Sequence, residues 1–199
     1  MTQDELGESK AQLYTRKAVG YESTLLTAIR GEFNRQGDEV LASVASVQRS
    51  IGGRTKDCVD SLLNWEQADA AVKRAVEPAL LAVIIETGLD AMQQIGMQPS
   101  GYDPYSEATT TWYQQRTTRV AVDVNDETEK QLRATLTEGV NAGESSHQLQ
   151  ARIEAVMGLA ATLRADLIAQ TEIARAQSYA DVQAWCQSGV VSGKEWYTA

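Results

Sequence analysis

The sequence has few of the side chains from which catalytic and metal sites are usually built. Its 199 residues include one histidine, His147, and two cysteines, Cys58 and Cys186. A multi-histidine metal site cannot be assembled from one histidine, and we interpret His147 as a surface residue just inside a helix start rather than as a member of a catalytic triad. The cysteines lie far apart without a neighbouring Cys or His at metal-ligand spacing. We expect reduced thiols there, with a disulfide between them as the alternative.

Long apolar runs and an excess of positive charge are also missing. The longest apolar stretch, 79–85, lies between Glu77 and Glu86 and is far shorter than the roughly 18 residues of a membrane span. The N-terminus has neither a basic start nor an apolar core, which argues against a standard export signal. A formal net charge of -9 opposes tight nonspecific DNA binding, because such binding needs clustered Lys and Arg. We therefore expect no membrane partner and no tight nucleic-acid binding.

The pattern that dominates the first half of the chain is helical. Apolar residues from Leu26 to Ile51 recur at spacings of three, four and seven. This predicts one long helix over 8–50, or two helices with a break near Gly37, ended by the glycine pair 52–53. Such a helix usually packs against a second helix of the same protein, and coiled-coil contact between copies is the alternative.

A second helix is predicted to follow and to supply that partner. Asn64 and Gln67 have the spacing of a helix N-cap, and an apolar face continues from there toward Gly96. Pro78 lies inside this pattern, where it removes one helical hydrogen bond and clashes with the preceding turn. We expect either a kink at Pro78 or a boundary between two shorter helices.

The next segment, 97–112, is predicted to be a linker loop. It is rich in Pro, Gly and small polar residues, and four aromatic residues lie in or beside it: Tyr102, Tyr105, Trp112 and Tyr113. We interpret it as a loop that covers the helical core, with a partner-binding patch as the alternative.

A short strand is predicted after the linker. The segment 119–124, RVAVDV, alternates valines with other residues, and Asp126 with Glu129 then marks a helix start. The other strand candidate is 194–198, so we pair the two into a ribbon packed on the later helices. The predicted fold is mainly α, with an N-terminal long-helix hairpin over 1–96 and a small C-terminal helical domain over 113–199 carrying at most a short two-stranded β ribbon.

The last predicted helix carries two charges within an apolar pattern. Apolar residues recur at roughly helical spacing in this segment: Leu163, Leu167, Ile168, Ala174, Val182 and Trp185. Glu172 and Arg175, three residues apart, can meet on one helix face. Arginine favours the ionised carboxylate, and no nucleophile or Gly-rich phosphate loop accompanies the pair, so we interpret it as a structural ion pair rather than a catalytic one. Gly189 is a candidate left-handed C-cap.

The C-terminal segment also carries a recognisable run of residues. It consists of Ala165, Ile168, Ala169, Thr171, Glu172, Arg175, Ala176, Gly189, Val190, Val191, Lys194, Trp196, Thr198 and Ala199. This run resembles the signature of the phage Mu F-like minor head proteins, also called the phage head morphogenesis family, which reads Ala-x-x-Ile-Ala-Arg-Thr-Glu-x-x-Arg-Ala, then Gly with valines, then Lys-x-Trp-x-Thr-Ala. Gln170 departs from it, since the family usually has arginine there.

A second stretch, 132–153, is similar to the family's Leu-x-x-x-Leu-x-x-Gly-x-x-x-Gly-Glu-Ser segment. Its matching residues are Gly139, Gly143, Glu144, Ser145, Arg152 and Ile153. Local physics accounts for part of this stretch, because Gly143 can end one helix and Ser145 can cap the next through Gln148. The resemblance is strong over about residues 116–199. Family members continue into an acidic turn with arginines and a His or paired Cys, so the resemblance implies a domain shortened at its C-terminus that lacks the chemistry of that turn.

The resemblance implies a structural protein rather than an enzyme, with no catalytic, cofactor-binding or metal-binding residue. It would be a minor head protein of a phage or prophage, present in few copies in the capsid interior or at the portal vertex and in the host cytoplasm during assembly. Its partners would be the portal or other head proteins, with self-association through the N-terminal helix as a further expectation. Two alternatives stay open: a portal-protein appendage, and an enzyme or toxin-like effector built on the same helical module. Neighbouring genes for portal and terminase, or for an immunity protein, would distinguish them.

Overall fold

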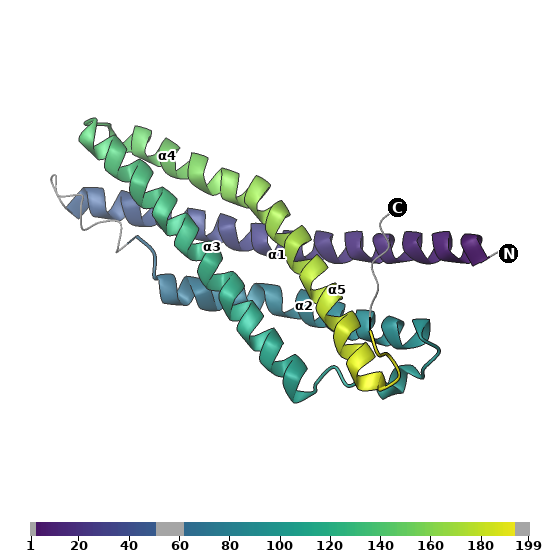
Figure 1. Ribbon diagram of the computed structural model, residues 1–199. Helices are drawn as coiled ribbons and strands as arrows, with labels where there is room; N and C mark the ends of the chain where they lie inside the picture. Colours follow the sequence, from purple (N-terminus) through teal and green to yellow (C-terminus); the bar gives the residue numbers. More distant parts are fainter. Residues whose placement is uncertain (1–2, 51–61, 194–199) are drawn as a thin grey trace.

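The computed structural model describes the backbone of residues 3–50 and 62–193, with side chains from residue 16 to 44 and from 62 to 193. Its helices are α1 (Gln3–Ser50), α2 (Trp65–Gln94), α3 (Glu107–Asn141), α4 (Ser146–Leu159) and α5 (Ala165–Ser188). A 3-10 turn, η2 (Pro99–Gly101), follows α2, and a π turn, η3 (Ala160–Arg164), joins α4 directly to α5. The chain therefore forms a bundle of four long helices, the last of which is α4, η3 and α5 together (Figure 1).

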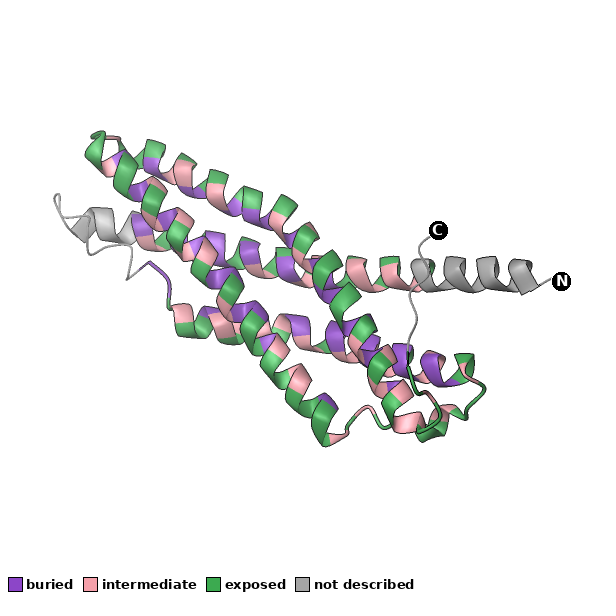
Figure 2. Cartoon of the chain, in the orientation of Figure 1, coloured by how far each residue is buried: buried purple, intermediate pink, exposed green. Residues whose placement is uncertain are grey.

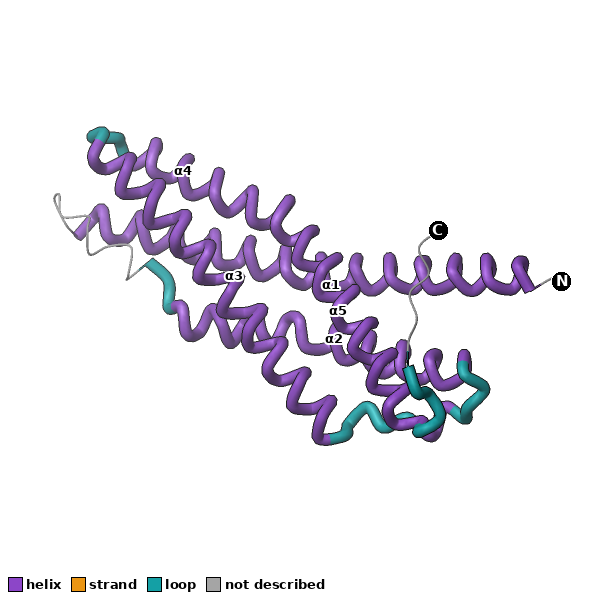
Figure 3. Tube along the Cα trace, viewed as in Figure 1, coloured by secondary structure: helices purple, strands orange, loops and turns teal. Residues whose placement is uncertain are grey.

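The prediction of a mainly α fold is confirmed, and the predicted β ribbon is not. Among the described residues there is no strand, as Figure 3 shows, and 119–124 lies inside α3. Val120 and Val124 are buried one helical turn apart, so valines that suggested alternation belong to a helical face. The segment 194–198, the expected second strand, lies outside the described residues. The helix start expected at Asp126 is also wrong, because α3 begins at Glu107.

The expected division into a hairpin and a small C-terminal domain is not seen. Buried residues of α1, α2, α3, α4 and α5 form one continuous hydrophobic core. Figure 2 shows this core as the purple faces that the helices turn toward one another. Within the described residues, no helix is long and apolar enough to cross a membrane.

Helix α1 is one continuous helix, as the first of the two predicted alternatives stated, and not two helices with a break near Gly37. Gly37 does not break it but lies in the interior, where an added Cβ would be 3.3 Å from the Cβ of Met157 on α4. The apolar stripe of α1 is buried in the bundle at Leu25, Ile29, Phe33, Val40 and Val44. This part of the stripe therefore serves the core of the protein itself.

Helix α2 begins as predicted. The Asn64 side chain accepts a hydrogen bond from the backbone N–H of Gln67 at 3.1 Å. The helix then runs unbroken through Pro78, so the expected boundary there is wrong. Pro78 and Arg74 are both exposed, and the carbonyl of Arg74 that the proline leaves unpaired can bond to water instead.

The loop after α2 covers the core, as the preferred interpretation stated. Tyr102 is 5% exposed and its hydroxyl donates to the carbonyl of Ile84 at 3.3 Å. Its ring lies against Gly88, where an added Cβ would be 2.0 Å from the ring carbon Cε1. Gln187 near the end of α5 holds the loop by accepting from the backbone N–H of Asp103 at 2.6 Å and donating to its carbonyl at 3.1 Å. The linker is shorter than the predicted 97–112, because α3 already begins at Glu107.

The buried face of α5 consists largely of small residues. It comprises Ala165, Ala169, Ile173, Ala176, Ala180 and Ala184. In contrast, Leu163, Leu167 and Val182, which the sequence suggested as part of the apolar face, are between 44% and 66% exposed. Alanines allow the backbones of two helices to approach closely, and α5 packs extensively against α2 in this way.

Two arginines attach the π turn to neighbouring helices, Arg30 of α1 and Arg164, the last residue of the turn itself. Arg30 on α1 donates from Nε to the carbonyl of Ala161 at 3.0 Å. Arg164 donates to the carbonyl of Val124 at 3.0 Å and to the hydroxyl of Thr128 at 3.1 Å, and lies 5.6 Å from the centre of the Phe33 ring. Burial lowers the pKa of the Arg164 guanidinium. These contacts pin the turn between α1 and α3.

A buried polar chain joins three helices. Gln36 on α1 donates to the side-chain oxygen of Asn125 on α3 at 3.0 Å, and Asn125 donates to Asp69 on α2 at 2.7 Å. Gln36 and Asn125 are at most 1% exposed. Because buried polar groups need partners, these hydrogen bonds fix the relative register of α1, α2 and α3.

Candidate functional site

The first cluster of motif residues forms the corner between α3 and α4. Gly143 has a φ of 69°, and the backbone N–H groups of Gly143 and Glu144 donate to the carbonyls of Val140 and Gly139, each at 3.0 Å. This is the hydrogen-bond pattern of a glycine-ended helix. The predicted helix stop at Gly143 is confirmed.

The start of α4 is also capped as predicted. The side chain of Gln148 accepts from the backbone N–H of Ser145 at 2.8 Å and from its hydroxyl at 2.8 Å. His147, beside this cap, is exposed, which confirms the interpretation of a surface histidine.

Arg152 ties this corner together. It makes a two-pronged ion pair with Glu144 at 2.6 and 2.7 Å and also donates to Thr135 and Glu138 on α3. Hydrogen bonds from Arg152 hold the pKa of the Glu144 carboxyl below its usual value. A Cβ at Gly139 would lie 2.9 Å from Arg152 Nε and 2.6 Å from Leu149, so the glycine makes room for the pair.

The second cluster surrounds Glu172 on α5. Arg175 donates to Glu172 at 2.9 Å, which confirms the predicted pair. Arg116 on α3 adds a two-pronged hydrogen bond to both oxygens of the same carboxylate. The side chain of Glu172 is 5% exposed, that of Arg116 19% and that of Arg175 53%. Bonding to Glu172 raises the pKa of Arg116. Two arginines and one carboxylate give the trio a formal charge of +1.

Sequence reasoning missed Arg116 as the main partner of Glu172. The two residues are 56 positions apart, and only the packing of α3 on α5 brings them together. Arg116 lies three residues before the segment 119–124, which was predicted to be a strand. With that segment taken as helical, Trp112, Arg116 and Val120 share one face at spacings of four, which would have aimed Arg116 at a neighbouring helix.

A shallow hollow opens beside this cluster on the surface between α3 and α5. It is lined by Trp112, Arg116, Thr171, Ala174, Arg175, Ser178 and Tyr179. The rings of Trp112 and Tyr179 stack with their centres 4.1 Å apart and an angle of 9° between their planes. Thr171, the motif residue before Glu172, is exposed at its rim.

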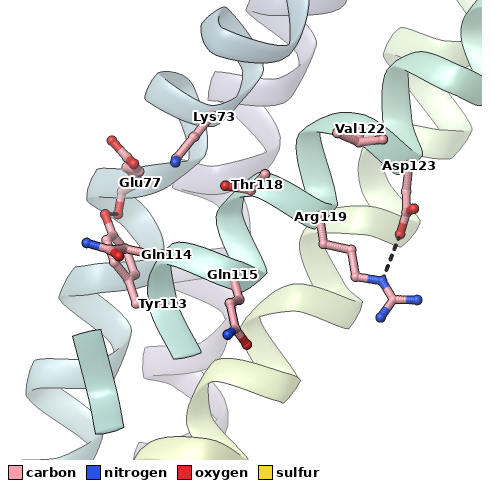
Figure 4. A pocket seen from close by; sticks show the side chains of 9 residues that line it. All are labelled: Lys73, Glu77, Tyr113, Gln114, Gln115, Thr118, Arg119, Val122 and Asp123. Carbon is pink, nitrogen blue, oxygen red and sulfur yellow. Dashed lines mark hydrogen bonds and ion pairs between the residues drawn. The ribbon is translucent and has the colours of Figure 1, made fainter. Parts of the chain in front are cut away.

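Another hollow lies between α2 and α3 (Figure 4). Its charged lining is mixed, with Lys73 and Arg119 offset by Glu77 and Asp123. Arg119 lies 3.6 Å from Asp123, and the hydroxyl of Tyr113 donates to the carbonyl of Glu77 at 3.1 Å. With mixed charge and no convergent donor set, it provides no evident catalytic arrangement.

The motif residues thus do not form one site. Gly143, Ser145 and Arg152 lie at the α3–α4 corner, whereas Thr171, Glu172 and Arg175 lie along α5, toward the other end of the bundle (Figure 1). Gly189, with a φ of 66°, ends α5 as predicted. Lys194 and Trp196 lie outside the described residues.

Residues able to hold a metal do not gather in the part of the chain that the structure describes. No group of three or more His, Cys, Asp or Glu side chains is arranged there to bind an ion. Cys186 is a free, exposed thiol, and Cys58 falls in the segment that is not described.

Comparison with known proteins adds no relative. The chain matches no family model, and no curated protein or solved structure is significantly similar to it.

Proposed function

We propose that this protein is a minor head protein of a phage or prophage, a structural component that acts at or near the portal vertex during head assembly or DNA passage. Its partners on this proposal are the portal or other head proteins. The part comparable to the head morphogenesis family is 113–199, and the region 1–96 completes its helical core.

One observation carries the proposal: the motif residues that the structure describes hold helices together. Gly143 and Ser145 end and begin helices, Arg152 joins α4 to α3, and Glu172 joins α5 to α3. A motif of helix caps and interhelical ion pairs suits a component whose task is to keep a defined shape within a larger assembly.

The N-terminal helix is one candidate surface for docking on the portal, but it cannot be removed whole without damage to the core. Removing residues 1–50 would delete Leu25, Ile29 and Phe33 from the core and destabilise the whole bundle. Removal of residues 1–15 spares these core side chains. The other candidate docking surface is an exposed apolar row formed by Leu159, Leu163 and Leu167, each between 55% and 66% exposed.

The test uses particles of the phage or prophage that encodes the chain. Heads and empty procapsids are separated on a density gradient and probed with an antibody against this protein. We expect it in both fractions at few copies per particle, and defective heads when its gene is deleted. Normal heads that lack the protein would refute the proposal.

Variants then locate the docking surface. The chain without residues 1–15 and the double variant Leu163→Ser, Leu167→Ser are each expressed with portal protein and captured through a tag. Loss of portal with the shortened chain alone assigns docking to the N-terminal helix, and loss with the serine variant alone assigns it to the exposed leucine row of η3 and α5. Antibody reactivity at the mass of the portal itself would instead indicate the portal-appendage alternative.

A further inference from the structure

The hollow between α3 and α5 differs from the rest of this acidic surface. The chain has a formal net charge of -9, yet the charged side chains lining this hollow are two arginines, Arg116 and Arg175. The carboxylate that neutralises one of them, Glu172, is buried behind them. The exposed wall is therefore locally positive.

Arg175 has hydrogen-bonding capacity left. One of its terminal nitrogens, Nη1, donates to Glu172, and its Nε and Nη2 groups have no partner among the described residues. The side chain is 53% exposed, so these groups reach the hollow at little cost of desolvation. Arg116 is already engaged by both oxygens of Glu172 and holds the carboxylate in place.

Two hydroxyls lie on the same face of α5 as Arg175. Thr171 precedes it by one helical turn and Ser178 follows by about one, so the three side chains form a row along the hollow. Both residues are exposed, and neither hydroxyl has a hydrogen-bond partner within the described ranges. The stacked rings of Trp112 and Tyr179 form the adjoining wall.

We propose that this hollow binds a phosphate group, held by the guanidinium of Arg175 and by the hydroxyl of one neighbour, Thr171 or Ser178, since the two hydroxyls lie about two helical turns apart. A guanidinium matches two phosphate oxygens in a planar fork, and the neighbouring hydroxyl can reach a further oxygen of a tetrahedral group. A carboxylate has only two oxygens in one plane, which the guanidinium alone would satisfy. The arrangement therefore fits phosphate better than carboxylate. The ring wall further suits a phosphate monoester with a planar group attached, such as a nucleotide.

The proposal is tested by titrating the isotope-labelled full chain with inorganic phosphate, with AMP and with acetate at constant ionic strength, followed by NMR. We expect saturable shifts at the Trp112 indole and at the amides from 171 to 178 with both phosphates. Tighter binding of AMP than of inorganic phosphate would assign a nucleotide, and equal binding would assign phosphate itself.

Matched variants separate the site from general charge. Losing a charged hydrogen-bond donor should weaken phosphate binding about tenfold in Arg175→Gln, while Arg119→Gln, an exposed arginine of the other hollow, should leave it unchanged. Arg175→Gln keeps the Arg116–Glu172 pair and is expected to fold, which circular dichroism checks. Shifts that do not saturate, an equal response to acetate, or equal weakening in both variants would overturn the proposal.

Discussion

Replacing Glu172 by glutamine should destabilise the bundle far more than replacing an exposed glutamate of α3 such as Glu107. The substitution keeps the shape of the side chain but removes the charge that two arginines share. Arg116 would then be left with a guanidinium that is only 19% exposed and has lost its charged partner. Breaking a buried ion pair from one side costs about 3–5 kcal/mol, and the partial exposure of Arg116 reduces this to about 2–4 kcal/mol.

The expected cost can be measured in two ways. For a domain of this size each kcal/mol shifts the thermal midpoint by about 2–4 °C, so Glu172→Gln should lower it by roughly 5–15 °C. Circular dichroism at the helical band follows the thermal transition, and urea unfolding gives the change in free energy directly. Unchanged slope of the urea transition would show that stability alone has changed.

Two companion variants test the reasoning behind the number. Arg175→Gln removes the more exposed partner and should cost about 0–1 kcal/mol, as surface pairs do. Arg116→Gln leaves Glu172 buried with one remaining partner and should cost more than Arg175→Gln. A Glu172→Gln protein with an unaltered midpoint, or an Arg175→Gln protein as unstable as Glu172→Gln, would refute the assignment of Arg116 as the main partner.

Three further predictions follow from particular contacts. Gly88→Ala should cost about 1–3 kcal/mol because its Cβ would displace the Tyr102 ring, whereas Gly31→Ala, which meets nothing within 4 Å, should stabilise α1 by up to about 1 kcal/mol; urea unfolding of both variants checks this. Burial raises the pKa of Tyr102 to about 12, so the stability it contributes is full below pH 10 and falls as pH rises toward 12. Tyr102→Phe should flatten this alkaline loss, and a wild-type slope in the variant would contradict the idea. The net charge of -9 predicts no appreciable duplex DNA binding at physiological salt, and salt-sensitive micromolar affinity in an anisotropy assay would disprove it.

Local signals in the sequence predicted local structure well. Asn64, Gly143, Ser145 and Gly189 all end or begin helices as expected, because a cap depends on a few adjacent residues. The Glu172–Arg175 pair was predictable for the same reason, since its spacing brings both side chains to one helix face.

Features that depend on distant residues were not predictable. The valines of 119–124 fit both a strand and a helix over so short a segment, and burial against neighbouring helices decided for the helix. In η3 and α5 the large apolar residues suggested a core face, but the alanines of α5 pack closely on α2, and Leu163 and Leu167 are left exposed. The Arg116–Glu172 contact, which joins α3 to α5, also depends on residues far apart in the sequence.

The π turn between α4 and α5 determines which side chains of α5 face the neighbouring helices. A π turn accommodates one more residue than an α-helical turn, and each residue rotates a helix by about 100°. Deleting one residue from 160–164 would let α4 and α5 join as a regular helix, but it would swing Glu172 away from Arg116 and replace the alanine face against α2. We therefore expect a one-residue deletion within 160–164 to destabilise the bundle, because it changes the rotation of the whole of α5 relative to its neighbours. The extra residue rotates α5 relative to α4 by a fixed angle. One continuous helical segment can therefore pack against α3 through α4 and against α2 through α5.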